Sequence, residues 1–389
     1  MEEFNWRALL KKTLSHALVA VLASVITMSL LAGETTKLTE LENIINTEFI
    51  GQTDMEKARD AAAEAMVKAL GDRWSYYISA EAYAAHQESM SNSYVGIGIT
   101  VEKREDGTGF EILEVAPGGS AQETGLLPGD VLVEANNEDA SKLTLEELRA
   151  VIRGEEGTKV SVGVLRNGEL LRFSVERRSI QIEVAKGTML QGNIGLVRIN
   201  NFNANCAKET IAAIKALQEQ GAKGLVFDVR FNPGGYVTEM VKVLDYLLPE
   251  GVVFREEDYR GKTGERTSDA ACVELPMAVI VNGSSYSAAE FFAAVLREYN
   301  WAVVVGQQTC GKGYYQNTIR LSDGSAVNLS TGKYFTPNGT NLTEIGGLTP
   351  DVPVTVDEKT AALIYAQVLP VEEDLQMQAA ILAVQQSMG

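Results

Sequence analysis

The stretch PMAVIVNGSSYSAAEFFAAVLREYNWAVVVG, residues 276–306, contains a strand, a helix and a second strand in succession. Both strands are almost wholly apolar, which is typical of a parallel sheet that is covered on both faces. The same alternation begins near residue 193, where the strand NIGLVRINNF, the helix CAKETIAAIKALQEQG and the strand GLVFDVR follow one another. The sequence therefore predicts an α/β core with a largely parallel sheet covered by helices.

Three serines lie between the first strand and the helix. Ser287 directly precedes the helix, where backbone N–H groups favour developing negative charge, so its hydroxyl is a candidate nucleophile. The alternative is that Ser284, Ser285 and Ser287 only cap the helix. The usual base for such a serine is histidine, and the chain has only His16 and His86, neither of them near this motif in sequence.

A lysine can replace histidine as the base if a dry environment lowers its pKa enough to leave a neutral amine. Lys312 is the candidate, because it follows the strand WAVVVG, and a strand–helix–strand unit returns it to the same sheet edge as Ser287. Gln316 lies an even number of residues farther along the next strand, where a neutral amide could orient the amine. A P-loop is disfavoured, because Gly313 follows Lys312 where that motif needs Ser or Thr.

An acyl-transfer reaction also needs donors for the oxyanion. The turn Asn232–Gly235 follows the strand GLVFDVR, at the carboxyl end where α/β proteins form their sites. Its glycines allow close backbone approach. We expect the N–H of Gly234 or Gly235, together with that of Ala288, to form this oxyanion hole.

Composition excludes several other classes of function. The formal charge of −18 argues against nucleic-acid binding, which needs clustered Lys and Arg. Cys206, Cys272 and Cys310 have no metal-ligand spacing, so we expect neither a metal nor another cofactor.

The amino terminus combines basic residues with an apolar run at residues 16–33. This pattern favours an uncleaved membrane anchor over a cleaved signal peptide, because Leu30 and Leu31 occupy positions where a cleavage site prefers small residues. It predicts a single-pass cell-membrane protein whose remaining chain is extracytoplasmic.

These motifs are similar to those of the carboxyl-terminal processing (tail-specific) serine peptidases, a family with a Ser-Lys dyad. NGSSYSAAEFFAAVLREYNWAVVVGQQTCGKGYYQ resembles the family's principal signature, and DVRFNPGG and TGKYFTPNGTNLTEIGGLTPDVPV resemble two further blocks. GDRWSYYISAEAY and IRGEEGT match lesser blocks. Tyr286, Ala289 and Cys310 depart from the family's usual Ala, Ser and Phe without removing a catalytic group.

The resemblance implies that Ser287 is the nucleophile, Lys312 the general base and Gln316 the orienting glutamine. It also implies that the short strands from about residue 94 form an inserted PDZ domain. Such a domain would bind a free carboxyl terminus through backbone N–H groups of the loop YVGIGI, near Val95, Gly96, Ile97 and Gly98. Arg153 is a further candidate, as a contact between the PDZ domain and the protease core that couples peptide binding to activation.

The predicted organisation has five parts. They are a cytoplasmic stub with membrane anchor or signal segment (1–33), a helical segment (34–90), the PDZ domain (91–180), the Ser-Lys protease core (181–357) and a helical tail (358–389). The sequence predicts a membrane-anchored serine endopeptidase that holds protein substrates by their C-terminal tails, and the family resemblance suggests a homodimer through the terminal helices. The alternative is a non-catalytic PDZ-type receptor for protein C-termini.

Overall fold

The computed structural model describes residues 36–388, and the chain divides into two units between Leu70 and Gly71. The apolar run expected to anchor the protein, residues 16–33, lies outside the described residues. None of the helices between residues 36 and 388 combines the length and the apolar content that crossing a bilayer requires.

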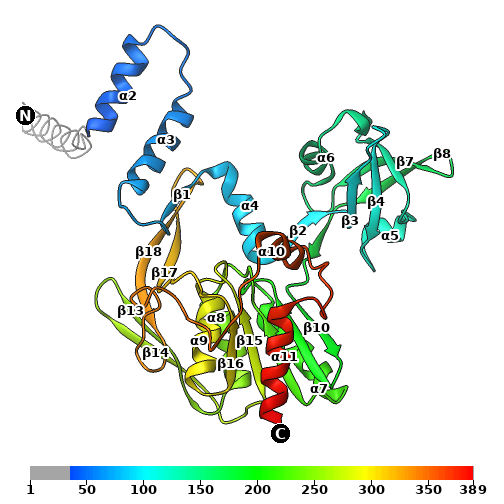
Figure 1. The fold of residues 1–389 in the computed structure, drawn as a ribbon. Helices are drawn as coiled ribbons and strands as arrows, with labels where there is room; N and C mark the ends of the chain where they lie inside the picture. The colour runs from blue at the N-terminus through cyan, green and yellow to red at the C-terminus, as the bar shows by residue number, and fades with distance from the viewer. Residues whose placement is uncertain (1–35, 389) are drawn as a thin grey trace, which may run out of the picture. The chain divides into compact units, whose positions relative to one another are not determined.

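The first unit contains two helices, α2 (Lys37–Glu48) and α3 (Met55–Lys68), drawn in blue in Figure 1. The side chains of Thr36 and Asp54 accept hydrogen bonds from backbone N–H groups in the first turns, which satisfies donors that a helix start leaves free. Helix formation in this Ala- and Glu-rich segment is confirmed. Several of its apolar side chains are exposed: Leu38, Leu41, Ile44, Met66 and Leu70.

The expectation that the helical segment continues to residue 90 is wrong at one place. Residues 72–75 form a turn, and Tyr76–Ile78 form strand β1, which pairs antiparallel with β18 (Ala326–Phe335). The helix resumes as α4 (Ala80–Ser91), capped by Ser79. Pairing with β18 outweighs the local helix preference of this sequence, as tertiary contacts often do.

Residues 93–181 form the β-rich module. Its strands are β2 (Ser93–Gly96), β3 (Ile99–Lys103), β4 (Phe110–Val115), β5 (Val131–Ala135), β6 (Glu138–Asp139), β7 (Lys159–Arg166), β8 (Glu169–Glu176) and β9 (Arg178–Gln181). Its helices are α5 (Ser120–Thr124), the 3-10 helix η1 (Ala140–Lys142) and α6 (Leu145–Ile152). Strands β3-β4-β5-β7-β8 make one antiparallel sheet, and β2 pairs with β9. The predicted Asn167–Gly168 turn joins β7 to β8, and the predicted capping box of Thr144 and Glu147 begins α6.

The central sheet of the core has the order β10-β11-β12-β15-β16-β19. These strands are β10 (Ala185–Leu190), β11 (Ile194–Ile199), β12 (Gly224–Asp228), β15 (Met277–Val281), β16 (Ala302–Gly306) and β19 (Val352–Pro353). All pairings from β11 to β19 are parallel, and β10 pairs antiparallel with β11. This sheet has the parallel pairing that its apolar strands predict.

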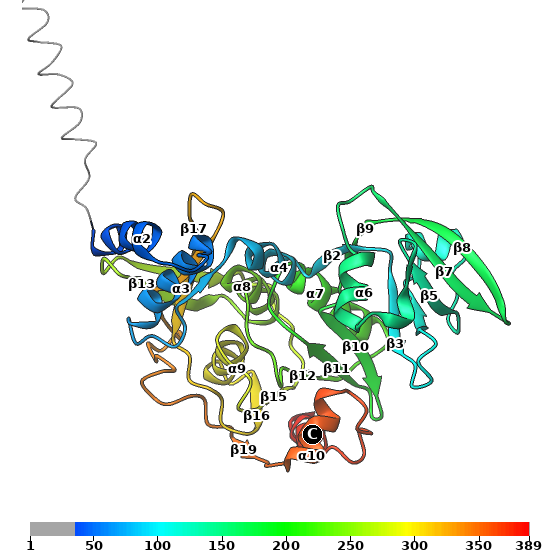
Figure 2. The ribbon, with the colours of Figure 1, turned by 90° about the horizontal axis from the view of Figure 1, so that it is seen from above.

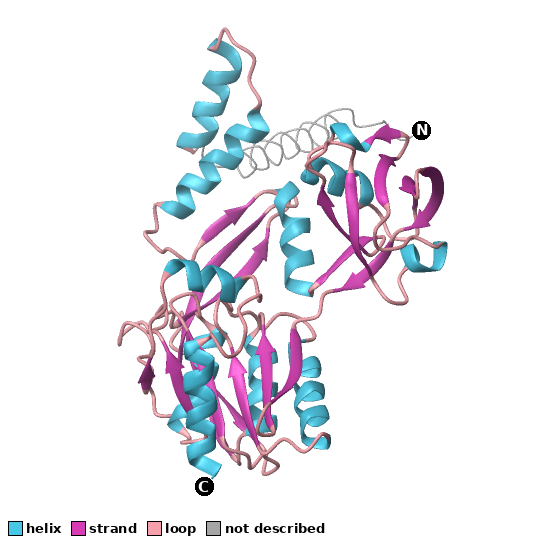
Figure 3. Ribbon diagram, turned by 45° about the vertical axis from the view of Figure 1, so that its right-hand side comes forward, coloured by secondary structure: helices cyan, strands magenta, loops and turns pink. Residues whose placement is uncertain are grey.

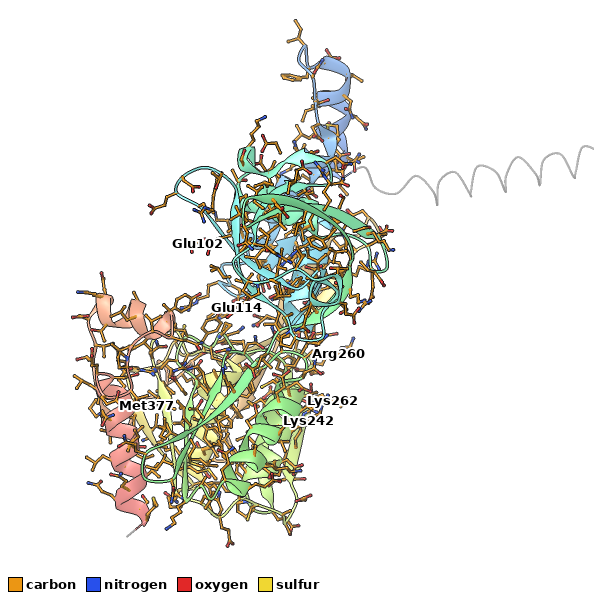
Figure 4. The ribbon with its side chains drawn as sticks, turned by 90° about the vertical axis from the view of Figure 1, so that its right-hand side faces the viewer. Glu102, Glu114, Lys242, Arg260, Lys262 and Met377 are labelled. Atoms are coloured by element: carbon orange, nitrogen blue, oxygen red, sulfur yellow. The ribbon has the colours of Figure 1, made fainter. Side chains whose placement is uncertain are left out.

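Helices cover both faces of the central sheet, as Figure 3 shows. Leu225 and Phe227 of β12 pack with α7 (Cys206–Glu219), α8 (Val237–Leu247) and α9 (Ala288–Glu298), whereas Val226 packs with α11 (Leu375–Met388). The alternation follows from the two-residue period of a strand. Met377 of α11, labelled in Figure 4, belongs to the second cluster and is buried.

A second sheet of the core is antiparallel throughout. Its strands follow the order β1-β18-β13-β14, where β13 covers Gly251–Asp258 and β14 covers Thr263–Ser268. A fifth strand, β17 (Tyr314–Arg320), also pairs with β18. Figure 2 shows β13 and β17 at one end of the core and β10 and β11 toward the other. The expectation of a largely parallel sheet is therefore right for the central sheet and not confirmed for the core as a whole.

A buried ionic network ties the C-terminal segment to the end of β12. Arg230 lies 2.7 Å from Asp228 and 2.8 Å from Asp374, and all three side chains are almost completely buried. Arg230 also donates to Gln376 at 3.1 Å. Burial opposes ionisation of Asp228, but Arg230 outweighs it and holds the pKa of this carboxyl below its usual value. The segment that follows α10 (Glu358–Tyr365) is thereby fixed at the carboxyl end of the central sheet.

Replacing Arg230 with Met would leave the Asp374 carboxylate buried without this ion-pair partner, and Asp228 with Arg198 at 3.4 Å. We expect the free energy of unfolding, measured by urea denaturation, to fall by about 3–5 kcal/mol. The control is Arg266→Met, because Arg266 lies 3.9 Å from Glu256 in a partly exposed pair, and we expect it to cost less than about 1 kcal/mol. Equal losses in the two variants would contradict the assigned role of the network.

Candidate active site

Ser287 occupies a strained turn between β15 and α9. Its backbone has φ 58° and ψ −125°, a conformation that a non-glycine residue rarely adopts. Ser285 stabilises this turn, because its buried hydroxyl donates to the Val229 carbonyl at 2.8 Å and accepts from the Asn282 N–H at 3.0 Å. Ser284 is exposed. Of the three serines, Ser287 alone lies at the helix N-terminus, half-buried.

The carboxylate of Glu290 joins the Ser287 turn to the loop that carries Lys312. This completely buried side chain accepts hydrogen bonds from the N–H of Ser287 at 3.1 Å, Gly311 at 2.8 Å and Lys312 at 2.5 Å. The hydroxyl of Thr309 donates to it at 2.5 Å. Burial raises the pKa of Glu290, although these hydrogen bonds act in the opposite direction. The arrangement fixes two distant chain segments to each other.

The side chain of Lys312 is half-buried, and its amine lies against two aromatic rings. Its Nζ is 4.6 Å from the centroid of the Trp74 ring and 6.0 Å from that of Tyr286. Burial lowers the pKa of this amine to about 8, although the negative charges of Asp72 and Glu290 favour its protonated form. About a tenth of the amine is therefore neutral at pH 7 and about half at pH 8, and this neutral form is the one that a general base requires.

Tyr334 is a second group that Ser287 and Lys312 share. Its buried hydroxyl donates to the carbonyl of Lys312 and is hydrogen-bonded to Ser287, and burial raises its pKa well above the ordinary value. Among residues 36–388, the Ser287 hydroxyl and the Lys312 amine form no direct hydrogen bond. The structure thus brings the two segments to one corner of the core, with the amine held over Trp74.

The expected oxyanion donors lie beside Ser287. A Cβ atom on Gly234, whose φ is 90°, would lie 2.8 Å from the Ser287 Cβ and 2.9 Å from the Ala288 nitrogen, so glycine is needed for this approach. The N–H of Gly234 already donates to the Asn232 side chain at 2.8 Å. Gly235 and Ala288 therefore remain as the candidate donors.

Gln316 does not reach Lys312 directly. Its side-chain N–H group donates to the Tyr314 carbonyl at 3.1 Å and to the Ser330 hydroxyl at 3.0 Å. Ser330 is in turn hydrogen-bonded to the carboxylate of Asp72, which lies near the Lys312 amine. The amide is thus linked to the lysine through two intervening side chains.

Sequence reasoning missed four residues of this corner: Asp72, Trp74, Glu290 and Tyr334. A signal existed for Glu290, because serine followed three residues later by glutamate is the spacing of a capping box. The other three lie in the stretches GDRWSYYISAEAY and TGKYFTPNGT, which the family resemblance includes without giving these residues a role. Pairing of β1 with β18 brings Asp72 and Trp74 to this corner, and no local pattern indicates that pairing.

The predicted peptide-binding loop follows β2. Val95 and Gly96 pair with β9, whereas the carbonyls of Ile97 and Gly98 accept hydrogen bonds from the N–H groups of Ala121 and Ala116. Strand β3 begins at the next residue and lies at the edge of its sheet, with one side free to pair with an added strand.

Arg153 ends helix α6 and lies against the segment that leads into the β-rich module. It donates to Glu88 of α4 at 3.1 Å, and its guanidinium lies 4.9 Å from the centroid of the Tyr94 ring. These are contacts with α4 and β2. No group of three His, Cys, Asp or Glu side chains between residues 36 and 388 could hold a metal ion.

Comparison with known proteins identifies the two parts of the chain. Residues 193–354 match the model of peptidase family S41, and residues 87–165 match the PDZ domain. The carboxy-terminal processing protease CtpA of Bacillus subtilis (strain 168) is 32% identical over 78% of this chain and 65% of its own length. The chain thus spans slightly less than two thirds of that relative.

A second relative and one solved structure are also similar to this chain. A protein of Staphylococcus aureus (strain N315) named "Probable CtpA-like serine protease" is 30% identical over 89% of this chain and 71% of its own length. A solved structure from Bacteroides fragilis NCTC 9343, titled "Putative S41 protease", is 17% identical and covers 84% of this chain and 90% of its own with a TM-score of 0.50, which is a likeness of fold.

Replacing Glu290 with Gln tests the connection between the two segments. The amide keeps one acceptor oxygen and presents an NH2 group to backbone donors, so at least one buried donor loses its partner. We expect the free energy of unfolding to fall by about 1–3 kcal/mol in urea denaturation. The control Glu219→Gln, at an exposed site of α7, should change it by less than about 0.5 kcal/mol. Unchanged stability of the Glu290 variant would overturn this role.

Proposed function

This chain belongs to peptidase family S41, and we propose that it is a carboxyl-terminal processing serine endopeptidase with Ser287 as nucleophile and Lys312 as base. The observation that carries this proposal is the buried Lys312 amine, whose pKa is lowered to about 8. Glu290 ties the backbone of this lysine to the strained turn of Ser287. An amine that is half neutral near pH 8 can serve as the base for a serine in a protein without a suitably placed histidine.

In the proposed reaction, the Ser287 hydroxyl attacks the peptide carbonyl while the neutral Lys312 amine accepts its proton. Negative charge develops on the carbonyl oxygen, where the N–H groups of Gly235 and Ala288 stabilise it. The tetrahedral intermediate collapses to an acyl-enzyme, and the lysine ammonium gives its proton to the leaving amine. Water then attacks the ester, its proton passing to Lys312, and the serine leaves with that proton.

In this proposal the amine moves from the Trp74 ring to the Ser287 hydroxyl. Its four-carbon side chain allows this, because rotations about the stem move the amine while the backbone of Lys312 stays fixed by Glu290. Gln316 assists indirectly, through Ser330 and Asp72.

The PDZ domain holds the substrate's C-terminal tail in this proposal. The free edge of β3 supports it, because a peptide can add there as a further strand. The terminal carboxylate would be bound by backbone N–H groups near Val95, Gly96, Ile97 and Gly98. Arg153 would transmit occupancy of the domain to α4 through Glu88.

The proposed setting is the outer side of the cell membrane. Residues 16–33 would anchor the chain, with the basic residues before them in the cytoplasm. A homodimer through the terminal helices is also proposed, supported by the exposed apolar side chains of α2 and α3.

Replacing Ser287 with Ala removes the proposed nucleophile without disturbing the PDZ domain. We expect cleavage of an unfolded test protein to fall at least about a thousandfold, while binding of a tail peptide is retained. Ser284→Ala is the control, since Ser284 is exposed on the same turn, and it should cleave at the parent rate. If the parent binds tails but cleaves no protein, the chain is the receptor and not the enzyme.

The pH dependence of cleavage tests the base. The pKa of Lys312 is lowered to about 8, so the neutral amine is lost as pH falls below that value. We expect kcat/KM to fall about tenfold per pH unit on the acidic side and to level off above. Lys312→Arg, which stays charged, should be inactive, whereas Lys262→Met, at an exposed lysine labelled in Figure 4, should keep the profile. A rate unchanged into mildly acidic pH would exclude this lysine as the base.

A further inference from the structure

The turn at residues 72–75 lies against the Lys312 amine although nearly 240 residues separate them in sequence. Strand β1 follows this turn directly and pairs with β18 in the register Tyr76 to Asn328. The turn is also fixed by the hydroxyl of Ser75, which accepts the Ser330 N–H at 3.0 Å. A segment that precedes the PDZ domain thus completes the wall around the proposed base.

We propose that Asp72 and Trp74 are positioning residues for the Lys312 amine, and that Gln316 acts on the amine only through Asp72. This inference rests on the proposed function, since it explains how the base of that reaction is held. It also assigns a role to two residues that neither catalytic motif contains.

Trp74 supplies the surface on which the amine rests. A cation over an indole ring is attracted by the ring's negative face, and the attraction is stronger where water is excluded. The 4.6 Å distance from Nζ to the ring centroid is within the range of this interaction. Trp74 is itself held, because Tyr286 packs on it with centroids 5.7 Å apart and the Arg73 guanidinium lies 4.1 Å from its centroid.

Asp72 supplies the fixed negative charge. Its carboxylate accepts the Ser75 hydroxyl at 2.6 Å and the Trp74 N–H at 3.1 Å, and it is hydrogen-bonded to Ser330. Burial opposes its ionisation, but these hydrogen bonds and the charge of Lys312 outweigh it and lower the pKa of the carboxyl. Asp72 therefore stays ionised and in one orientation at neutral pH.

A chain of hydrogen bonds connects this carboxylate to Gln316. The amide donates to the Ser330 hydroxyl at 3.0 Å, which leaves that hydroxyl's own proton for Asp72. The negative charge of this carboxylate in turn favours the protonated Lys312 amine. Loss of the Gln316 amide would therefore free the orientation of the Asp72 carboxylate, and the position of the Lys312 amine would change only as a result.

Besides Trp74, several other groups lie near the amine, and none of them duplicates Asp72. They are the carboxylate of Glu290, the thiol of Cys310, the guanidinium of Arg73 and the phenol of Tyr286. Glu290 is occupied by four donors, including the lysine's own backbone N–H. Arg73 is positive, and it donates to the Cys310 sulfur at 2.9 Å. Asp72 is therefore the carboxylate near the amine that does not also anchor the catalytic loops.

The test measures the Lys312 amine itself in the full-length protein. Asp72→Asn removes the charge with little change of shape, and Glu81→Gln removes an exposed carboxylate nine residues farther along. The pH dependence of Lys312 acetylation by acetic anhydride, read by mass spectrometry, gives the midpoint of amine titration. We expect Asp72→Asn to shift this midpoint to lower pH by about one unit, with the acidic limb of kcat/KM moving equally, and Glu81→Gln to shift neither.

The outcomes separate the two proposals. An unchanged amine midpoint in Asp72→Asn overturns the positioning role. A shifted midpoint in a protein that cleaves no substrate supports the positioning role and refutes the proposed enzyme. A purely structural role for Asp72 would lower stability without moving either midpoint, which also overturns the proposal.

Two further sets of variants keep the proposal testable if Asp72→Asn does not fold. Trp74→Leu should lower kcat roughly tenfold with KM unchanged, and Trp74→Phe, which keeps an aromatic face, should recover most of the loss. The effects of Gln316→Ala and Ser330→Ala on kcat should be strongly non-additive, because both break one chain. Additive effects, or a Phe variant as impaired as the Leu variant, would overturn it.

Discussion

The buried carboxylate of Glu290 is the interaction on which the rest of the site depends. Its donors come from the turn that precedes its own helix and from a loop 19 to 22 residues farther along the chain. A carboxylate that is completely buried is tolerated only when its oxygens are hydrogen-bonded, and four donors bind the oxygens of Glu290. Because two of these donors are the backbone N–H groups of Ser287 and Lys312, the same contact fixes both proposed catalytic residues.

The two sheets of the core contribute different parts of this corner. Adjacent parallel strands β15 and β16 end at one edge, so the chain leaving each of them arrives at the same place. The antiparallel sheet then brings β17, β18 and β1 alongside, and with them Gln316, Ser330 and the turn that contains Asp72 and Trp74. The proposed base is thus surrounded by segments from both ends of the core sequence.

Much of this arrangement follows from sequence patterns. Wholly apolar strands alternating with amphipathic helices predict the central sheet, and the position of Ser287 and Lys312 after adjacent strands predicts their proximity. The antiparallel sheet was not predicted, because its half-exposed strands carry weaker patterns and β1 reads locally as helix. The hydrogen bond from the Gly234 N–H to the side chain of Asn232 depends on the rotamer of that asparagine, which no sequence pattern reports.

The most direct measurement of the central claim is a crystal structure with a bound peptide boronic acid, which forms a covalent bond with an activated hydroxyl and resembles the tetrahedral intermediate. The account predicts boron bonded to the Ser287 oxygen, the Lys312 amine within about 3 Å of that oxygen, and a boronate oxygen facing the N–H groups of Gly235 and Ala288. Boron bonded to another residue, or a lysine amine still out of contact with the serine, would contradict it.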